Sequence, residues 1–431
     1  MHSVTHVGGA SRRRLLILDD DALVGSTLQR MVVRHGLEAC CVTTVGEFLR
    51  LLEEWHPDIL CLDLMMPGMD GIEVIRLLGD SHLRAQVIIT SGVESRILHA
   101  AERSALAHGI NLLGVLAKPY AVGELRQLLA RAVDSADGAD RATGAACPVA
   151  RSESPDAAAA GTEPAPLTAD DLRCALERGE IGLAFQPKLD CRSGGLVGFE
   201  ALARWQHPDR GSIGPDVFVA LAERCGLIDL LTCEITDQAL LWLSGLARRW
   251  DGSEQMRQQL AQARLSLNVS ALSLGNAALF LRIAEHCRAL GVAPQRVVLE
   301  VTESSAMQDA TTALDNLTRL RLQGFHLSID DFGTGYSSMV QLVKLPFSEL
   351  KIDKSFVMTA AASEESRAII RSVVDLGRSL GMTTTAEGVE DAFALQYLKE
   401  LGCDHMQGYL LSRPLAPDAV IPWLRTREAQ H

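Results

Sequence analysis

Residues 326–335 read His-Leu-Ser-Ile-Asp-Asp-Phe-Gly-Thr-Gly, an apolar run that ends in two adjacent acids and a glycine-rich turn. The run predicts a buried strand over His326–Ile329 with Asp330 and Asp331 at its carboxyl end. Similar short strands are expected on both sides, and helical patterns separate most of them. These further strands are Gly182–Lys188, Leu196–Trp205, Leu265–Val269, Val297–Val301, Glu349–Ile352, Thr383–Ala386 and His405–Gly408.

Eight strands with intervening helices in residues 168–426 indicate a modified (β/α)8, TIM-like barrel. The first two strands are joined only by residues 190–195, which are too few for the crossover helix that parallel neighbours require. We therefore expect the first strand of the barrel to be antiparallel to the second.

A smaller α/β pattern precedes this barrel. Its apolar runs are Leu15–Leu18, Ile59–Leu62, Val87–Ile89 and a last strand near Leu112–Leu116. Helical patterns alternate with them, over Leu23–Val33, Gly46–Glu54, Ile72–Leu78, Arg96–Ala107 and Val122–Val133. The alternation predicts a doubly wound (βα)5 domain over residues 13–133.

The composition changes between the two domains. Residues 134–167 are rich in Ala, Gly, Ser, Pro and Asp and contain no aromatic residue. Such a segment buries too little apolar area to offset the conformational entropy lost on ordering. We therefore expect a flexible linker there.

The overall composition narrows the functional classes. The 431 residues include 54 Asp and Glu against 41 Lys and Arg, a net charge of −13 that disfavours a protein coating nucleic acid. The chain has no run of about 18 apolar residues and no apolar signal-peptide core at its N-terminus, so we expect no membrane span. The ten cysteines form no CxxC pair, which favours reduced thiols and a cytoplasmic location.

Charged residues follow several strands of the smaller domain. Asp19 and Asp20 follow the run Leu15–Leu18, Asp63 directly follows Ile59–Leu62, and Lys118 follows the last strand. Because the carboxyl ends of parallel strands share one edge of the sheet, these groups should form one site. A hard cation such as Mg²⁺ would relieve the repulsion between the carboxylates. Taken singly, each Asp could instead be a turn or helix-cap residue.

This set, with the segment Asp-Leu-Met-Met-Pro-Gly at 63–68, resembles a response-regulator receiver domain. The resemblance implies that Asp63 is the phosphoacceptor. It also implies that Asp19, Asp20 and Asp63 hold one Mg²⁺ ion.

Two further positions carry the same resemblance. Ser91 and Lys118 match the hydroxyl and the ammonium that contact the phosphoryl group, and Thr90 is the less favoured hydroxyl. The resemblance implies a cis peptide bond before Pro119. Val115 stands where the family usually has an aromatic switch residue, so the usual coupling between hydroxyl and aromatic group is not expected.

The barrel carries a larger set of polar residues at its expected strand ends. Lys351 and Asp353, two residues apart, share one face of a strand, as do Glu200 and Arg204. If those faces point inward, the site suits one or two divalent metals and a phosphate. Singly, these residues could be solvated strand residues, turn residues or ion pairs. The set is Glu200, Asn268, Glu300, Asp330, Asp331, Lys351, Asp353 and Glu387.

Residues 168–426 resemble the EAL-domain phosphodiesterases of cyclic di-GMP, whose signature stands here as Glu-Ala-Leu at 200–202. The resemblance implies catalytic roles for Glu200, Lys351 and Glu387, with Lys351 orienting the attacking water and Glu387 acting as general base or metal ligand. It also implies two Mg²⁺ or Mn²⁺ ions. Their ligands would be Glu200, Asn268, Glu300, Asp330, Asp331, Asp353 and Glu387.

The same resemblance assigns supporting residues. Gln186, Arg204 and Gln407 match residues that contact the substrate. Glu303 and Glu390 match residues that support the loops of the site. No catalytic position is missing, which favours an active enzyme.

Together these resemblances predict a two-component response regulator that hydrolyses cyclic di-GMP to linear 5′-pGpG under control of Asp63 phosphorylation. The expected partners are cyclic di-GMP, a sensor histidine kinase or phosphotransfer protein, and a second copy of the chain. Direct DNA binding is not expected, because no domain-sized segment remains.

Two other functions stay open. One is a catalytically silent cyclic di-GMP receptor that signals through protein contacts. The other is a barrel lyase or aldolase in which Lys351 forms a Schiff base or acts as a base. A cyclase is disfavoured because the sequence Gly-Gly-Asp-Glu-Phe does not occur.

Overall fold

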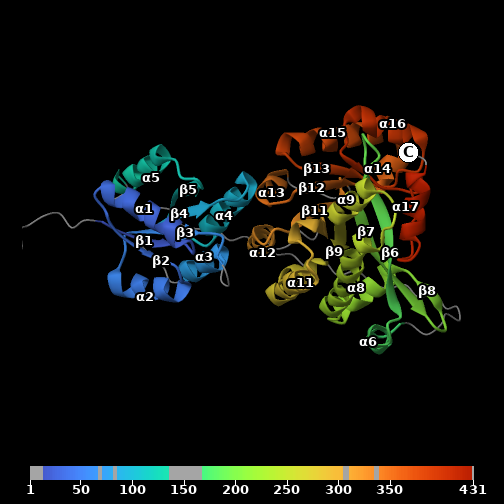
Figure 1. Cartoon of the computed structure of the whole chain (residues 1–431), viewed down its shortest axis with the longest axis horizontal. Coiled ribbons are helices and arrows are strands. Elements are labelled where there is room, and N and C mark those ends of the chain that lie inside the picture. The colour runs from blue at the N-terminus through green and yellow to red at the C-terminus, as the bar shows by residue number, and fades with distance from the viewer. Residues whose placement is uncertain are drawn as a thin grey trace, which may run out of the picture. The chain divides into compact units, whose positions relative to one another are not determined.

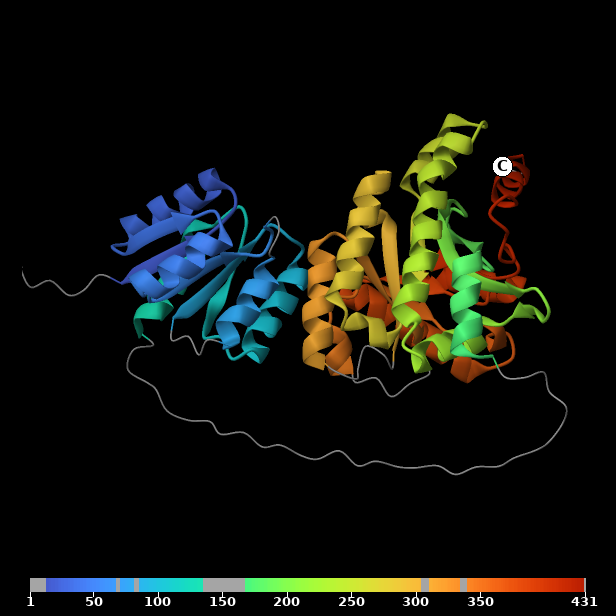
Figure 2. The same cartoon turned by 90° about the horizontal axis from the view of Figure 1, so that it is seen from below.

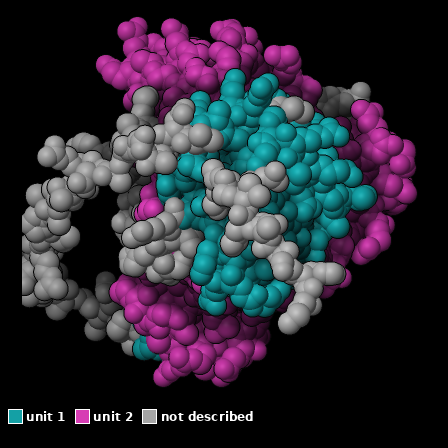
Figure 3. All heavy atoms as spheres, turned by 90° about the vertical axis from the view of Figure 1, so that its left-hand side faces the viewer, with its two compact units in different colours: residues 1–63, 84–92, 111–168 teal, residues 64–83, 93–110, 169–431 magenta. Residues whose placement is uncertain are grey.

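The computed structural model describes residues 13–66, 70–80, 85–134, 167–303, 310–333 and 339–429. The chain divides into two compact units, which Figure 3 shows in two colours: residues 1–63, 84–92 and 111–168, and residues 64–83, 93–110 and 169–431. One β-sheet lies in each unit. Nearly all of the expected linker falls outside the described residues, so the predicted boundaries at 133 and 168 stay predictions.

The first sheet has five parallel strands in the order β2-β1-β3-β4-β5 (Figure 1). Its strands are β1 (Arg14–Leu18), β2 (Glu38–Val42), β3 (Ile59–Asp63), β4 (Gln86–Ser91) and β5 (Leu112–Ala117). The helices that alternate with them are α1 (Ala22–Arg34), α2 (Val45–Trp55), α3 (Gly71–Asp80), α4 (Ser95–Ala107) and α5 (Val122–Asp134). The expected (βα)5 order is confirmed. The sequence analysis did not locate β2, whose short Ala-Cys-Cys-Val run lacks the Leu and Ile residues of the other strands and is largely half-buried.

The second sheet closes into an eight-stranded barrel in the order β6-β14-β13-β12-β11-β10-β9-β7, and β6 also pairs with β7. The barrel strands are β6 (Ile181–Asp190), β7 (Leu196–His207), β9 (Arg264–Asn268), β10 (Val297–Thr302), β11 (His326–Phe332), β12 (Glu349–Ile352), β13 (Thr383–Ala386) and β14 (His405–Met406). Strand β6 is antiparallel to β7, as predicted, and also to β14, and the other barrel pairs are parallel. The short strand β8 (Gly211–Ile213) extends the sheet beside β7.

Helices surround the barrel strands in both views (Figures 1 and 2). They are α6 (Ala169–Arg178), α7 (Pro215–Arg224), α8 (Ile228–Arg249), α9 (Glu254–Gln262), α10 (Ala271–Leu274), α11 (Ala277–Leu290), η2 (Pro294–Arg296), α12 (Ala310–Leu322), α13 (Met339–Lys344), α14 (Lys354–Thr359), α15 (Glu364–Leu380), α16 (Ala392–Leu401) and α17 (Val420–Glu428). No helix among the described residues has both the length and the apolar character needed to cross a membrane.

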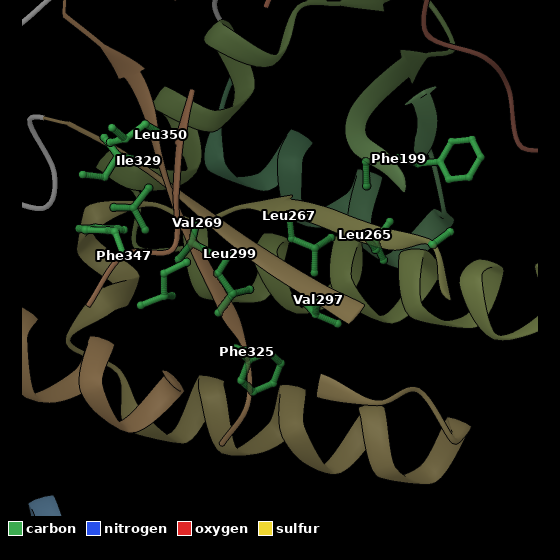
Figure 4. Packing of buried hydrophobic residues seen from close by; sticks show 14 of the residues in the cluster. Phe199, Leu265, Leu267, Val269, Val297, Leu299, Phe325, Ile329, Phe347 and Leu350 are labelled. Carbon is green, nitrogen blue, oxygen red and sulfur yellow. The ribbon is translucent and has the colours of Figure 1, made fainter. Parts of the chain in front are cut away.

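The two faces of the barrel strands differ in character. Phe199, Leu265 and Leu299 belong to the large apolar core that the strands share with the surrounding helices (Figure 4). The alternate positions Glu300 and Lys351 are polar yet only 1% exposed. Because successive side chains of a strand point to opposite faces, the apolar layer lies outside the barrel strands and polar groups collect in the interior.

Candidate active site and phosphoacceptor site

The phosphoacceptor site predicted in the first unit comes together at the ends of β1, β3 and β5. The Lys118 ammonium donates to Asp19 Oδ2 and to Asp63 Oδ2, each at 2.8 Å. Both carboxylates are buried, whereas Asp20 is exposed. One carboxylate oxygen from each of Asp19, Asp20 and Asp63 lies within 4.8 Å of the others, close enough to share one cation.

The expected flanking residues lie on β4, on β5 or directly after β5, and their roles stay predictions. Ser91 is buried at the end of β4. Thr90 donates its hydroxyl to the Leu62 carbonyl at 3.2 Å. The Lys118–Pro119 bond is cis. Val115 is half-buried in β5.

The sequence analysis missed Tyr120 at this site, although it directly follows the lysine–proline pair. Its hydroxyl lies 3.3 Å from Asp19 Oδ2. Burial, and then charges nearby that include Asp19, raise the pKa of this phenol, so it stays protonated and can donate to the carboxylate.

In the barrel, Lys351 is the centre of the acidic cluster. Its ammonium, buried inside the barrel, lies 2.6 Å from Glu300 Oε2, 2.6 Å from Glu387 Oε1 and 3.0 Å from Asp330 Oδ1. Glu200 Oε1 is 3.8 Å away. Strands β7, β10 and β11 and the residue directly after β13 therefore bring four carboxylates to one cation, and Glu200 lies within β7, not at its end as the sequence predicted.

Glu200 also joins the acids to the amide side chains. Asn268 Nδ2 donates to Glu200 Oε1 at 3.0 Å, and Gln407 Nε2 donates to Glu200 Oε2 at 2.6 Å. Gln407 Nε2 is also 3.0 Å from Gln186 Oε1. Burial alone would raise the pKa of Glu200, but Lys351 and these two hydrogen bonds lower it below its usual range.

The second acid of the pair, Asp331, lies where the chain leaves β11. Its φ of 54° is left-handed, a conformation that Asp tolerates better than most residues. Glu303 supports the segment, because its Oε2 accepts from Gly333 N at 3.0 Å. Asp353 caps α14 by accepting from Ser355 N at 3.0 Å.

The cluster has more negative charge than one lysine can balance. Burial and neighbouring acids raise the pKa of Glu300 to about 7, of Asp331 to about 6 and of Glu387 to about 8. One oxygen each from Asp330, Asp331 and Glu387 lies within 4.8 Å of the others. Hard oxygen ligands in a site that lacks positive charge fit divalent cations such as Mg²⁺ or Mn²⁺.

Two predicted residues are not drawn into this cluster by a direct contact. Arg204 is half-buried, and its Nη1 donates to the Ala203 carbonyl at 2.8 Å. Glu390 is exposed. The substrate role of Arg204 and the supporting role of Glu390 stay predictions. The loop residues 334–338 lie outside the described part of the chain.

The sequence analysis missed a polar layer directly beneath the cluster. Lys188, Glu349 and Thr385 lie inside the barrel and are all buried. Lys188 Nζ donates to Glu349 Oε1 at 2.9 Å, and Thr385 also hydrogen-bonds to Glu349. The alternation of strand side chains could have found them, because Lys188 follows Gln186 by two residues and Glu349 precedes Lys351 by two.

Comparison with known proteins places both halves of the chain in families. The EAL domain model matches residues 169–414, and the response regulator receiver domain model matches residues 15–130. The cyclic di-GMP phosphodiesterase RocR of Pseudomonas aeruginosa is 34% identical over 93% of this chain and 96% of its own. The cyclic di-GMP phosphodiesterase NbdA of the same organism is 38% identical over 59% of this chain, which covers 32% of NbdA.

A solved structure shows the same barrel. The MucR phosphodiesterase in complex with cyclic di-GMP matches with a TM-score of 0.53 and 39% identity, over 58% of this chain and 98% of that one. Since two family models match in series and RocR aligns over nearly its whole length, this chain belongs to the EAL-domain family and is a response regulator with an N-terminal receiver domain.

Proposed function

We propose that this protein hydrolyses cyclic di-GMP to linear 5′-pGpG and that phosphorylation of Asp63 controls the reaction. The observation that carries the proposal is the barrel's acid cluster, in which Glu200, Glu300, Asp330 and Glu387 surround the Lys351 ammonium. The names of RocR and NbdA support the choice of substrate.

The donor set fits two divalent cations. Glu200, Asn268, Glu300, Asp330, Asp331, Asp353 and Glu387 are the residues that would hold them. When bound, divalent cations activate water as a nucleophile and offset charge on the phosphoryl oxygens.

The chain's own residues have complementary roles. Glu387 acts either as the general base for the attacking water or as a metal ligand, and burial and neighbouring acids raise its pKa. Lys351 holds Glu387 and Glu300 in place and keeps positive charge beside the phosphate. The attack on phosphorus breaks the bond to the ribose 3′ oxygen, which takes up a proton as the ring opens.

Amide groups at the rim are suited to the nucleotide. Gln407 Oε1 is buried and has no hydrogen-bond partner among the described residues, so it is an acceptor available to a base N–H. Gln186 lies beside it, and Arg204 is the cation that we assign to the substrate's phosphate.

The lyase or aldolase alternative is disfavoured. A Schiff base requires a neutral amine, but the acids around Lys351 raise its pKa well above the usual value in spite of its burial. The silent receptor remains the competing hypothesis, and turnover distinguishes it from the enzyme.

The decisive experiment is product analysis by liquid chromatography after incubation of the full chain with cyclic di-GMP and Mg²⁺ or Mn²⁺. We expect linear 5′-pGpG, no product in EDTA, and a loss of most turnover in Glu387→Gln with nucleotide binding retained. Glu400→Gln, an exposed substitution on α16, is the matched control. Nucleotide binding without product under both metals would favour the receptor.

Regulation and partners form a second part of the proposal. A sensor histidine kinase or phosphotransfer protein would phosphorylate Asp63 in the cytoplasm, and the chain would act as a homo-oligomer. Phosphorylation then shifts the equilibrium between a more active and a less active arrangement of the domains or subunits. We would compare kcat and KM with and without beryllofluoride, a phosphoryl mimic, and measure mass by light scattering. Unchanged kinetics in both the mimic and Asp63→Asn would refute the regulation.

A further inference from the structure

We propose that Lys188, anchored by Glu349, is a positioning residue that fixes the carboxylate of Glu300 in the orientation needed to hold a divalent cation. This inference deepens the proposed function and rests on it. Neither Lys188 nor Glu349 belongs to the set of ligands and catalytic residues described above.

The geometry places Lys188 between two carboxylates. Its ammonium, on the inner face of β6, donates to Glu349 Oε1 at 2.9 Å and to Ser266 Oγ at 3.2 Å. The third contact is with Glu300 Oε1 at 3.4 Å. An ammonium has three N–H donors, so these three acceptors account for all of them.

Glu300 is thereby held from both sides. Lys351 contacts its Oε2 at 2.6 Å, and Lys188 contacts its Oε1 at the longer distance of 3.4 Å. The short bond limits the position of one oxygen, and the second ammonium limits rotation of the carboxylate about that bond. The Lys188 contact is loose enough to leave Oε1 available to a metal, as expected of the outer partners that orient metal ligands.

Glu349 keeps Lys188 at that distance. The Lys188 ammonium lies 2.9 Å from Glu349 Oε1, and Thr385 hydrogen-bonds to the same carboxylate, so Glu349 is itself fixed in place. Lys188 and Glu349 thus form an ion pair buried inside the barrel. Apolar side chains of similar size would fill the same space without the cost of desolvating two charges, so stability alone gives little reason for the pair.

The test measures metal binding separately from turnover. Mn²⁺ is titrated into the full chain without nucleotide and followed by electron paramagnetic resonance. Every protein compared also carries Asp20→Asn. This substitution weakens Mn²⁺ binding at the phosphoacceptor site of Asp19, Asp20 and Asp63, so that site contributes less to the measured binding. The first variant is Glu349→Gln, in which Lys188 keeps Glu300 as its only carboxylate and moves toward Oε1, where it competes with the cation. The second is Lys188→Met with Glu349→Gln, which changes no net charge and frees Glu300.

We expect both variants to weaken Mn²⁺ binding at least tenfold. The fold-decrease in kcat at saturating metal should be smaller than the fold-decrease in Mn²⁺ affinity. Lys399→Met, which removes an exposed lysine from α16, should change neither. Folded variants whose Mn²⁺ affinity stays within twofold would overturn the proposal. If neither variant folds, the pair stabilises the barrel instead of positioning Glu300, which also overturns it. An inactive parent protein would contradict the proposed function. The Mn²⁺ comparison would still test the positioning role, because it does not depend on turnover.

Discussion

Replacement of Lys351 by methionine tests the charge balance of the barrel site directly. The ammonium is 1% exposed and lies within 3.0 Å of Glu300, Asp330 and Glu387. Removal of one partner of a buried ion pair costs about 3–5 kcal/mol, because the remaining charge is left without compensation. For a domain of this size, each kcal/mol lowers Tm by roughly 2–4 °C, so we expect a fall of roughly 6–20 °C without metal.

Addition of Mg²⁺ should recover part of this loss. A cation that binds only the folded state stabilises it, by about 2.7 kcal/mol at a hundredfold excess over Kd, and the variant has one positive charge fewer to repel it. The assay is calorimetric unfolding in EDTA and in Mg²⁺, with the exposed Lys354→Met as the matched control. A Lys351→Met protein that unfolds in EDTA within about 2 °C of the parent would refute the reasoning.

Three further predictions concern other parts of the molecule. Asp63→Asn should abolish labelling by acetyl phosphate, since an amide forms no acyl phosphate. Labelling of this variant would show that another residue is the phosphoacceptor. Gly198→Ala should destabilise the barrel by about 1–3 kcal/mol in urea, because its Cβ would lie 2.3 Å from the Arg264 carbonyl oxygen. Gly182→Ala on β6 meets nothing within 4 Å and is the control, so equal effects would contradict the argument. Burial and two neighbouring arginines lower the pKa of His326 from 6.5 to about 4, so the unfolded chain takes up its proton first. Stability should therefore fall as pH falls from 6.5 to 4, and His326→Gln should flatten that slope in denaturant titrations.

The sequence by itself determined where most of the strands lie and which polar residues lie at or near their carboxyl ends. Apolar runs such as Leu15–Leu18 mark buried strands whatever the surroundings, and an acid that directly follows such a run must lie near the edge of the sheet. The short connection at 190–195 was enough to predict the antiparallel first strand, because no crossover helix fits in it. Motif resemblance then predicted that Asp63 is the phosphoacceptor and that Glu200 is a metal ligand and catalytic residue.

Only the tertiary structure decided which groups meet across the barrel. Lys188 and Glu349 are 161 positions apart and lie on strands that are not neighbours in the sheet, so local spacing carries no sign of their pairing. The edge strand β2 was also missed, because its half-buried Ala-Cys-Cys-Val run is a weaker apolar signal than the Leu and Ile runs of the buried strands. Strand periodicity gives the face on which a side chain lies. The partner that the side chain meets there depends on the closure of the sheet, which brings residues of distant strands into one interior.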